Sequence, residues 1–291
     1  MERVGEAPSN LVTVIRSVNG HAGGAYPSYP GRVSLDEPVR GSFAYLEQPG
    51  LFSVPPVEQL RLFIEGRLPA PPLTHLSGLV VEDASEGTTT WSIPASPRWR
   101  TAAGVFAGGT LSFVADAALA GAVFTKVPTG TMLLSSDLSM NFLAPAQPSS
   151  EKLIARGTII DVGRRQGLSE ARVEDAHGTL LAHATSRCVL QPMPFDPPPA
   201  PEAFAPVEPA GFDTPDPYLR PDEGEVIPQE ERDEVSGLDL VHLWSKGDRP
   251  NPPTVRCSDS GSWRRPSATR SWRCRRRCGS APGSEPSTAG R

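Results

Sequence analysis

The chain has 291 residues, which is enough for one or two domains. Its 38% hydrophobic and 21% charged residues are typical of a globular protein, although 33 prolines are more than such proteins usually contain. No run of 18 or more apolar residues occurs, and the N-terminus lacks the basic segment and long apolar core of a signal peptide. We therefore expect a cytoplasmic protein that makes no membrane contact.

The net charge of −5 conceals an uneven distribution of charge along the chain. Residues 256–291 hold nine arginines and only two acidic residues, whereas the rest of the chain carries 19 basic and 31 acidic residues and a net charge of −12. So acidic a body is not expected to bind nucleic acid. Three of the four cysteines also lie in this basic tail, and only Cys188 belongs to the body of the chain, residues 1–255.

The first half of the chain predicts one short helix, two strands and one long helix. Residues 1–50 are rich in Gly, Pro and Ser, and they form an N-terminal extension that we leave unassigned. A short helix is predicted over 56–66, where glycine and the prolines that follow end it. Strands are predicted over 76–84 and 88–95, and a helix that is apolar on nearly every side is predicted over 108–124.

The second half of the body predicts four consecutive strands, over 131–143, 152–163, 167–176 and 179–190. Sequential strands favour an antiparallel meander. One apolar helix is suited to being wrapped by a single curved sheet, so the fold class is predicted to be α+β. In the first strand, alternation puts Ser135, Asp137, Ser139 and Asn141 on one face. Its apolar residues do not alternate cleanly with these, so we expect this strand to be covered on both sides.

Residues 195–231 are rich in proline and acidic residues, which predicts a linker or a loose wrap. After them, "VSGLDLVHLWSKGDRPNPP" resembles the earlier "VEQLRLFIEGRLPAPP", and both carry Pro-x-Pro-Pro, at 69–72 and at 250–253. This repeat predicts that residues 232–255 begin a second domain of the same kind.

The tail at 256–291 has no hydrophobic period and almost no aliphatic residues, so we expect it to be disordered and to make no contact that bears on function. Two interpretations are open: a disordered basic tail, or a reading-frame error. We favour the second. Codons read one base over are compatible with "LSGLVVE" and "SIPAS" of the first domain, at the same spacing that separates Gly78 from Pro94.

Four stretches together resemble the hotdog-fold acyl-CoA thioesterases of the PaaI-like group: "GGTLSFVADAALAGA", "DLSMNFLAPA", "LIARGTIIDVGRR" and "GTLLAHATSRCVL". The resemblance covers about residues 72–192 and assigns a hotdog domain to 51–194. In that group two glycines open the central helix and an acidic residue follows seven positions after the second, the spacing of Gly109 and Asp116. The group has histidine before the glycines, where this chain has Ala107. That difference puts in doubt how the pocket mouth is shaped or how the substrate is polarised.

The resemblance implies a tandem-hotdog acyl-CoA thioesterase whose second domain is truncated and out of frame. It implies no cofactor other than the coenzyme A that forms part of the substrate, and no metal. It also implies a homodimer or a higher homo-oligomer, in which the acid of one subunit faces the helix N-terminus of the other.

The residues themselves favour the same chemistry. An ionised carboxylate buried without partners costs several kcal/mol, so Asp116 in so apolar a helix needs a reason. Free N–H groups of Gly108 and Gly109 at the helix start would stabilise the negative charge that develops on a thioester carbonyl. Asp116 would serve as the base that activates water, or as a nucleophile. Within one subunit the two groups would lie about 10 Å apart along the helix.

Other residues are candidates for substrate contacts. Arg164 and Arg165, in the turn "VGRRQG", suit the phosphates of coenzyme A, or they belong to a solvated turn. Ser112 shares the helix face of Asp116, either as a substrate contact or as an ordinary polar group on the helix. Asp137 and Asn141 would line the acyl tunnel or face solvent.

Alternatives also remain for the main site and for the function. Asp116 would be structural if it caps a neighbouring backbone or pairs at a dimer seam, and the two glycines would then serve only close packing. The second function class is a non-catalytic acyl-CoA-binding or degenerate hotdog module. A hotdog hydratase is a weaker third, since its helix signature is missing.

Two further expectations concern metals and the acyl group. His177 and His183 have no paired ligands at metal spacing. A tunnel lined by Leu, Met and Phe favours an aromatic or medium-chain acyl group.

Overall fold

The computed structural model describes residues 40–207, 211–221 and 224–254. These residues belong to one compact unit, Met1–Gly261, whereas a second unit, Ser262–Arg291, lies outside the described residues. The predictions for residues 1–39 and for the basic tail at 256–291 therefore also fall outside them.

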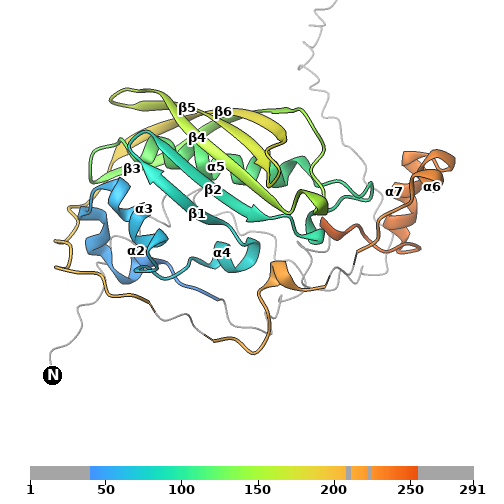
Figure 1. Ribbon diagram of the computed structural model, residues 1–291, viewed down its shortest axis with the longest axis horizontal. Helices are drawn as coiled ribbons and strands as arrows, with labels where there is room; N and C mark the ends of the chain where they lie inside the picture. The colour runs from blue at the N-terminus through green and yellow to red at the C-terminus, as the bar shows by residue number, and fades with distance from the viewer. Residues whose placement is uncertain (1–39, 208–210, 222–223, 255–291) are drawn as a thin grey trace, which may run out of the picture. The chain divides into compact units, whose positions relative to one another are not determined.

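A single long helix and a six-stranded antiparallel sheet form the centre of the protein (Figure 1). The helix is α5 (Gly108–Phe124), with the bounds that the sequence predicts. The strands are β1 (Val80–Ser85), β2 (Thr88–Pro94), β3 (Thr131–Phe142), β4 (Lys152–Val162), β5 (Gln166–Asp175) and β6 (Leu180–Pro192). They are ordered β1-β2-β4-β5-β6-β3, and α5 contacts β2, β3, β4, β5 and β6. This is the α+β hotdog fold that the sequence predicts.

The prediction of a four-strand meander is wrong for β3. Strands β4, β5 and β6 do form a meander, but β3 pairs with β6 at the far edge of the sheet. Alternation within a strand specifies its two faces and says nothing about its partner, so the sequence left this pairing undetermined. The expectation that the strand is covered on both sides is also wrong, because Leu134 is 45% exposed and Phe142 is 54% exposed.

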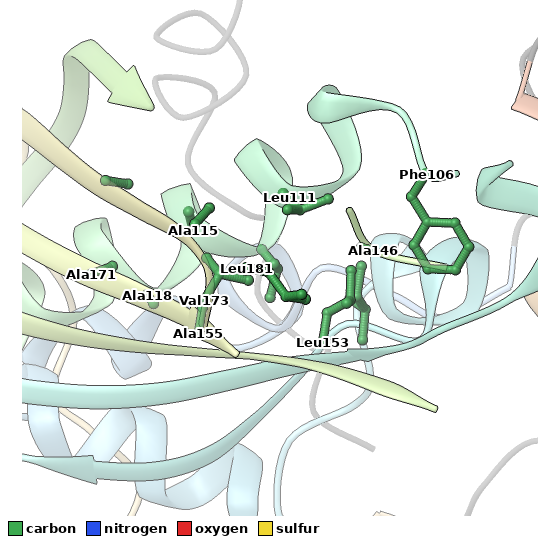
Figure 2. Packing of buried hydrophobic residues seen from close by; sticks show 14 of the residues in the cluster. Phe106, Leu111, Ala115, Ala118, Ala146, Leu153, Ala155, Ala171, Val173 and Leu181 are labelled. Carbon is green, nitrogen blue, oxygen red and sulfur yellow. The ribbon is translucent and has the colours of Figure 1, made fainter. Parts of the chain in front are cut away.

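The core lies between α5 and the sheet, and small side chains bring the helix close to the strands. Figure 2 shows Ala115 and Ala118 of α5 among Ala155, Val173 and Leu181 of the sheet, all of them buried. The closest approach is at Gly157 of β4, where an added Cβ would lie 2.1 Å from the carbonyl oxygen of Ala118. Glycine is required there because a main-chain atom occupies the space that any side chain would need.

A group of short helices packs beside the sheet, formed by α2 (Ala44–Glu47), η1 (Pro49–Ser53), α3 (Pro56–Ile64) and α4 (Pro72–Ser77). The predicted helix over 56–66 is confirmed as α3, whereas α4 was not predicted. The segment that follows β6 returns to these helices, and its Phe204 is buried with Ala44, Leu51 and Leu68. We call residues 40–77 together with the described residues of 195–219 the cap. The part of the proline-rich segment that supplies Phe204 is thus packed against the cap helices.

The remaining described elements are short: η2 (Pro97–Trp99), η3 (Pro148–Ser150), η4 (Pro217–Leu219), α6 (Gln229–Glu234) and α7 (Gly237–Lys246). Helix α7 ends at Lys246 and is followed by Gly247, which has a φ of +78°, much as α3 is followed by Gly66 with a φ of +66°. Both glycines are followed by Pro-x-Pro-Pro, so the sequence repeat has a local structural counterpart. The second domain that the repeat predicts would continue beyond residue 254, outside the described residues. Within the described ranges, no helix is both long and apolar enough to cross a bilayer.

Candidate active site

One stripe of α5 is left open by the sheet, and Asp116 lies on it. Ser112, Phe113, Asp116 and Ala117 are half-buried, whereas the residues on the other faces of the helix around them are fully buried. A shallow pocket of about 440 Å³ opens at this stripe. Its walls are formed by Ser112, Phe113, Asp116, Ser135, Ser136, Asp137 and Leu138. The carboxylate in the apolar helix is therefore accessible to a ligand.

Asp116 is held by a residue of the neighbouring strand. The hydroxyl of Ser135 on β3 donates a hydrogen bond to Oδ1 of Asp116 over 2.9 Å. A carboxylate has room for about four hydrogen bonds, so this contact leaves capacity on Asp116 to bind a water molecule. The arrangement fixes the side chain without neutralising its charge.

Cys188 lies on β6, the strand next to β3, where it pairs with Ser135. Burial raises the pKa of the Cys188 thiol, and the nearby carboxylates of Asp116 and Asp137 act in the same direction. Because the thiolate is the nucleophilic form, a thiol whose pKa is raised is unsuited to attack at neutral pH. Asp116 is therefore the better candidate for the reacting group at this site.

The register of β3 shifts between Ser135 and Asp137. Ser135 contacts α5 before this bulge, and Met140 and Phe142 pack toward α5 after it. The predicted single face of Ser135, Asp137, Ser139 and Asn141 is therefore wrong, because one extra residue reverses the alternation.

The bulge also sets the position of Asp137, which bonds to the neighbouring strand. Its Oδ1 accepts the N–H of Arg187 over 2.9 Å, and its Oδ2 lies 3.8 Å from the guanidinium of Arg187. Asp137 reaches the rim of the pocket. Asn141 is exposed on β3 opposite His183 and is not among the pocket residues.

The N-terminus of α5 presents main-chain donors. Ala107 is the N-cap and has no capping side chain, and a helix leaves its first N–H groups, here those of Gly108 and Gly109, without intrahelical acceptors. The space beside the Cα atom of Gly109 is open, with no described atom within 4 Å of an added Cβ. At Gly108 an added Cβ would lie 2.8 Å from the ring of Phe142. Ser112 donates its hydroxyl to the carbonyl of Gly108 over 3.0 Å.

The two halves of the predicted site lie apart within one chain. Gly109 and Asp116 are separated by seven residues, or about 10 Å of helix rise. A thioester carbonyl that touches the helix amides of one chain cannot at the same time receive a water held by Asp116 of that chain.

Arg164 and Arg165 lie at the opposite end of α5. They are exposed in the turn between β4 and β5, next to Gly167, whose added Cβ would meet the side chain of Val123. From Gly109 to Val123 the helix rises about 21 Å. Within one chain, the structure therefore holds these arginines away from the helix amides, and neither of them lines the pocket of Asp116.

Sequence reasoning did not assign Phe113, Ser135, Ser136 or Leu138 to the site, although they form more than half of the pocket wall. The spacing of Phe113 and Asp116 on a helix was a usable signal, since residues three apart share a face. The three strand residues required knowledge of how β3 lies against α5. Among the described residues, no group of three or more His, Cys, Asp or Glu side chains is placed to hold a metal ion.

Comparisons with known proteins relate part of the chain to one superfamily. Residues 103–182 match the family model described as the thioesterase superfamily. A search of curated proteins found no match. Among solved structures, a thioesterase of Haemophilus influenzae is 19% identical, and the alignment covers 48% of this chain and 92% of that one with a TM-score of 0.41. A phenylacetic acid degradation-related protein of Ralstonia eutropha is 23% identical, with coverages of 45% and 98% and a TM-score of 0.41.

Proposed function

Because residues 103–182 belong to the thioesterase superfamily, we propose that this protein hydrolyses acyl-CoA thioesters to a free acid and coenzyme A. The observation that best supports this proposal is the placement of Asp116. It is a carboxylate on the open stripe of an otherwise apolar helix, oriented by Ser135 and facing a pocket. A purely structural carboxylate would be expected to have its oxygens bonded to protein donors, and the structure gives one such bond.

In the proposed reaction Asp116 acts as the general base. It accepts a proton from a water molecule, whose oxygen then attacks the thioester carbonyl carbon. The carbon–sulfur bond breaks, and the departing coenzyme A thiolate takes up a proton to leave as the thiol. Direct attack by Asp116, which would give an anhydride that water then cleaves, is the nucleophilic form of the same proposal.

The helix N-terminus supplies the second part of the chemistry. The N–H groups of Gly108 and Gly109 and the positive end of the helix dipole stabilise the oxygen that becomes negative in the tetrahedral intermediate. The absence of a side chain at Gly109 leaves room for the carbonyl to reach these donors. Ala107 takes no part through its side chain, so in this chain the polarisation is assigned to the main chain.

Because Gly109 and Asp116 of one chain lie about 10 Å apart along the helix, we propose that two copies complete each site. Within the described part of the chain β3 pairs only with β6, so its outer edge has unpaired main-chain groups, and Leu138 and Phe142 of this strand are exposed. Such an edge is suited to pairing with another strand. Antiparallel pairing of two β3 edges about a two-fold axis would bring the start of one β3 beside the end of the other.

This pairing would also give a role to the turn between β4 and β5, which carries Arg164 and Arg165 and which we call the arginine turn. The start of β3 lies at the C-terminal end of α5, near Arg164 and Arg165, whereas Phe142 at its end touches Gly108. Two-fold pairing would therefore bring the arginine turn of one copy toward the glycine pair of the other. Arg164 and Arg165 are proposed there as contacts for the phosphates of coenzyme A.

The proposal is tested by incubating the purified protein with a panel of acyl-CoAs and following thiol release with a chromogenic reagent. The expected result is enzyme-dependent release of free thiol from at least one acyl-CoA, with an equal amount of free acid. Saturable acyl-CoA binding with no thiol released from any member of the panel would contradict the proposal. It would indicate a non-catalytic acyl-CoA-binding module instead.

A further inference from the structure

A second and much larger cavity lies beyond the pocket of Asp116. Its volume is about 1330 Å³, above the range of about 300–1,000 Å³ that is usual for small-ligand pockets. It is lined by the cap, strand β1, the C-terminal half of α5 and the start of β3, and it is partly open to solvent. Aromatic residues from distant parts of the chain meet in its wall, among them Phe52, Phe63, Trp91, Phe124 and Phe195.

Two segments far apart in the sequence, residues 40–77 and residues 211–216, lie on one side of this cavity and are joined by specific contacts. The buried guanidinium of Arg40 donates to Asp216 and to the carbonyl of Thr214, each over 2.9 Å, and it lies 4.5 Å from the ring centre of Phe212. His75 contacts the same carboxylate of Asp216 at 3.1 Å. Charge-assisted hydrogen bonds of this kind hold two segments in a defined position. The residues around 212–216 are therefore held against the residues around 40 and 75 on this side of the cavity.

The wall of the cavity carries few polar groups, and among the described residues Nε1 of Trp91 is a buried side-chain nitrogen without a hydrogen-bond acceptor. No Lys, Arg, Asp or Glu of the described residues contributes to it. Its amide and phenol groups already have partners: Tyr45 donates its hydroxyl to Gln59, and Gln59 donates to the carbonyl of Val54. Burial raises the pKa of Tyr45, which keeps the phenol neutral. An apolar ligand would meet no unsatisfied charge, whereas a charged one would lose its hydration without compensation.

The cavity lies next to the candidate active site along α5 and β3. Asp116 lines the pocket and Ala120, one turn further along α5, lines the cavity, a helix rise of about 6 Å. On β3 the boundary falls between Leu134 in the cavity wall and Ser135 in the pocket wall. A thioester whose carbonyl lies at Asp116 would therefore have its acyl group directed along α5 toward the cavity.

We infer that the cavity is the acyl chamber of this thioesterase and that its substrate carries a long, unsubstituted aliphatic acyl chain. This inference rests on the proposed function and names its substrate class. It differs from the expectation of an aromatic or medium-chain acyl group, because the volume exceeds what such a group fills and the cap supplies most of the wall. The cap then acts as the specificity element of the enzyme.

Filling the cavity tests this inference. Ala120→Phe places a ring at the end of the chamber nearest the pocket, and Ala70→Phe places one in the chamber from the cap, without altering α5. Ala176→Phe, in the exposed turn between β5 and β6, is the matched control. We expect each filling variant to lower the ratio of kcat/KM for palmitoyl-CoA to that for hexanoyl-CoA at least tenfold. A tenfold change corresponds to about 1.4 kcal/mol, which the loss of two buried methylene contacts would supply.

Binding of palmitate, measured by calorimetry without any turnover, separates this inference from the proposed function. Wild-type protein and Ala176→Phe are expected to bind palmitate, and both filling variants are expected to bind it at least tenfold more weakly. If palmitate binds but no acyl-CoA is hydrolysed, the proposed function fails and the chamber stands. If acyl-CoAs are hydrolysed while palmitate does not bind, or the ratio is unchanged in folded filling variants, the acyl chamber is overturned and the cavity belongs to another occupant, such as a second copy of the chain.

Discussion

Replacing Asp116 by asparagine is expected to lower kcat by at least about 100-fold, the usual contribution of a positioned general base. Asparagine has nearly the same volume and can still accept a hydrogen bond from Ser135, so the pocket should keep its shape. What the variant loses is the ability to take a proton from water. KM and the affinity for a non-hydrolysable acyl-CoA analogue should change little, since the carboxylate is assigned to the chemical step.

Steady-state thiol release and calorimetric binding of the analogue check this prediction together. Asp83→Asn makes the same change at an exposed carboxylate of β1, and it is the matched control, expected to turn over like wild type. A structural role for Asp116 would show as a lower melting temperature with kcat retained in the remaining folded protein. Normal turnover by a fully folded Asp116→Asn protein would contradict the assignment of the base.

The largest effect on stability is expected from Gly157→Ala. The new methyl group would lie 2.1 Å from the carbonyl oxygen of Ala118, so α5 would have to move away from β4. That carbonyl also accepts a hydrogen bond from the buried Thr89 hydroxyl over 2.9 Å, which the movement would strain. Overpacking a core commonly costs about 1–3 kcal/mol, and clash with the main chain places this variant at about 3 kcal/mol or more.

Urea unfolding followed by circular dichroism measures this change in the free energy of unfolding. Gly163→Ala is the control, because its added Cβ would have its nearest contact at 3.7 Å, an ordinary van der Waals distance. We expect the control to stay within about 0.5 kcal/mol of wild type, as is usual for surface changes. A Gly157→Ala protein as stable as wild type would mean that α5 does not lie as close to β4 as the structure shows.

The parts of the fold that depend on local pattern could be predicted from the sequence. The two glycines and the long apolar run gave the bounds of α5, and the strands followed from β-rich runs between turn residues. Asp116 could be singled out because a carboxylate in such a helix is unusual in itself. In each case the deciding information lies within one short stretch of the chain.

The parts that depend on distant contacts could not be predicted. Two features determine which strand residues reach Asp116: the pairing of β3 with β6, and the bulge between Ser135 and Asp137. The alternation of polar and apolar residues along the strand specifies neither of them. In the cap, Phe204 packs against Ala44, Leu51 and Leu68, which lie far from it in the chain, and no local pattern indicates this contact. Arg164 and Arg165 were candidates by residue type, and only the fold shows that one chain holds them at the wrong end of α5.

The central claim is that each active site combines Asp116 of one copy with the helix amides of another, and a mixed dimer tests it most directly. Gly109→Leu fills the open space beside the amides and, like Asp116→Asn, is expected to be inactive alone. Dimers that contain one chain of each variant, isolated through two different affinity tags, would hold one intact site out of two. We predict that they recover about half of the wild-type rate of thiol release per dimer. Mixed dimers as inactive as the two parent variants would contradict the claim.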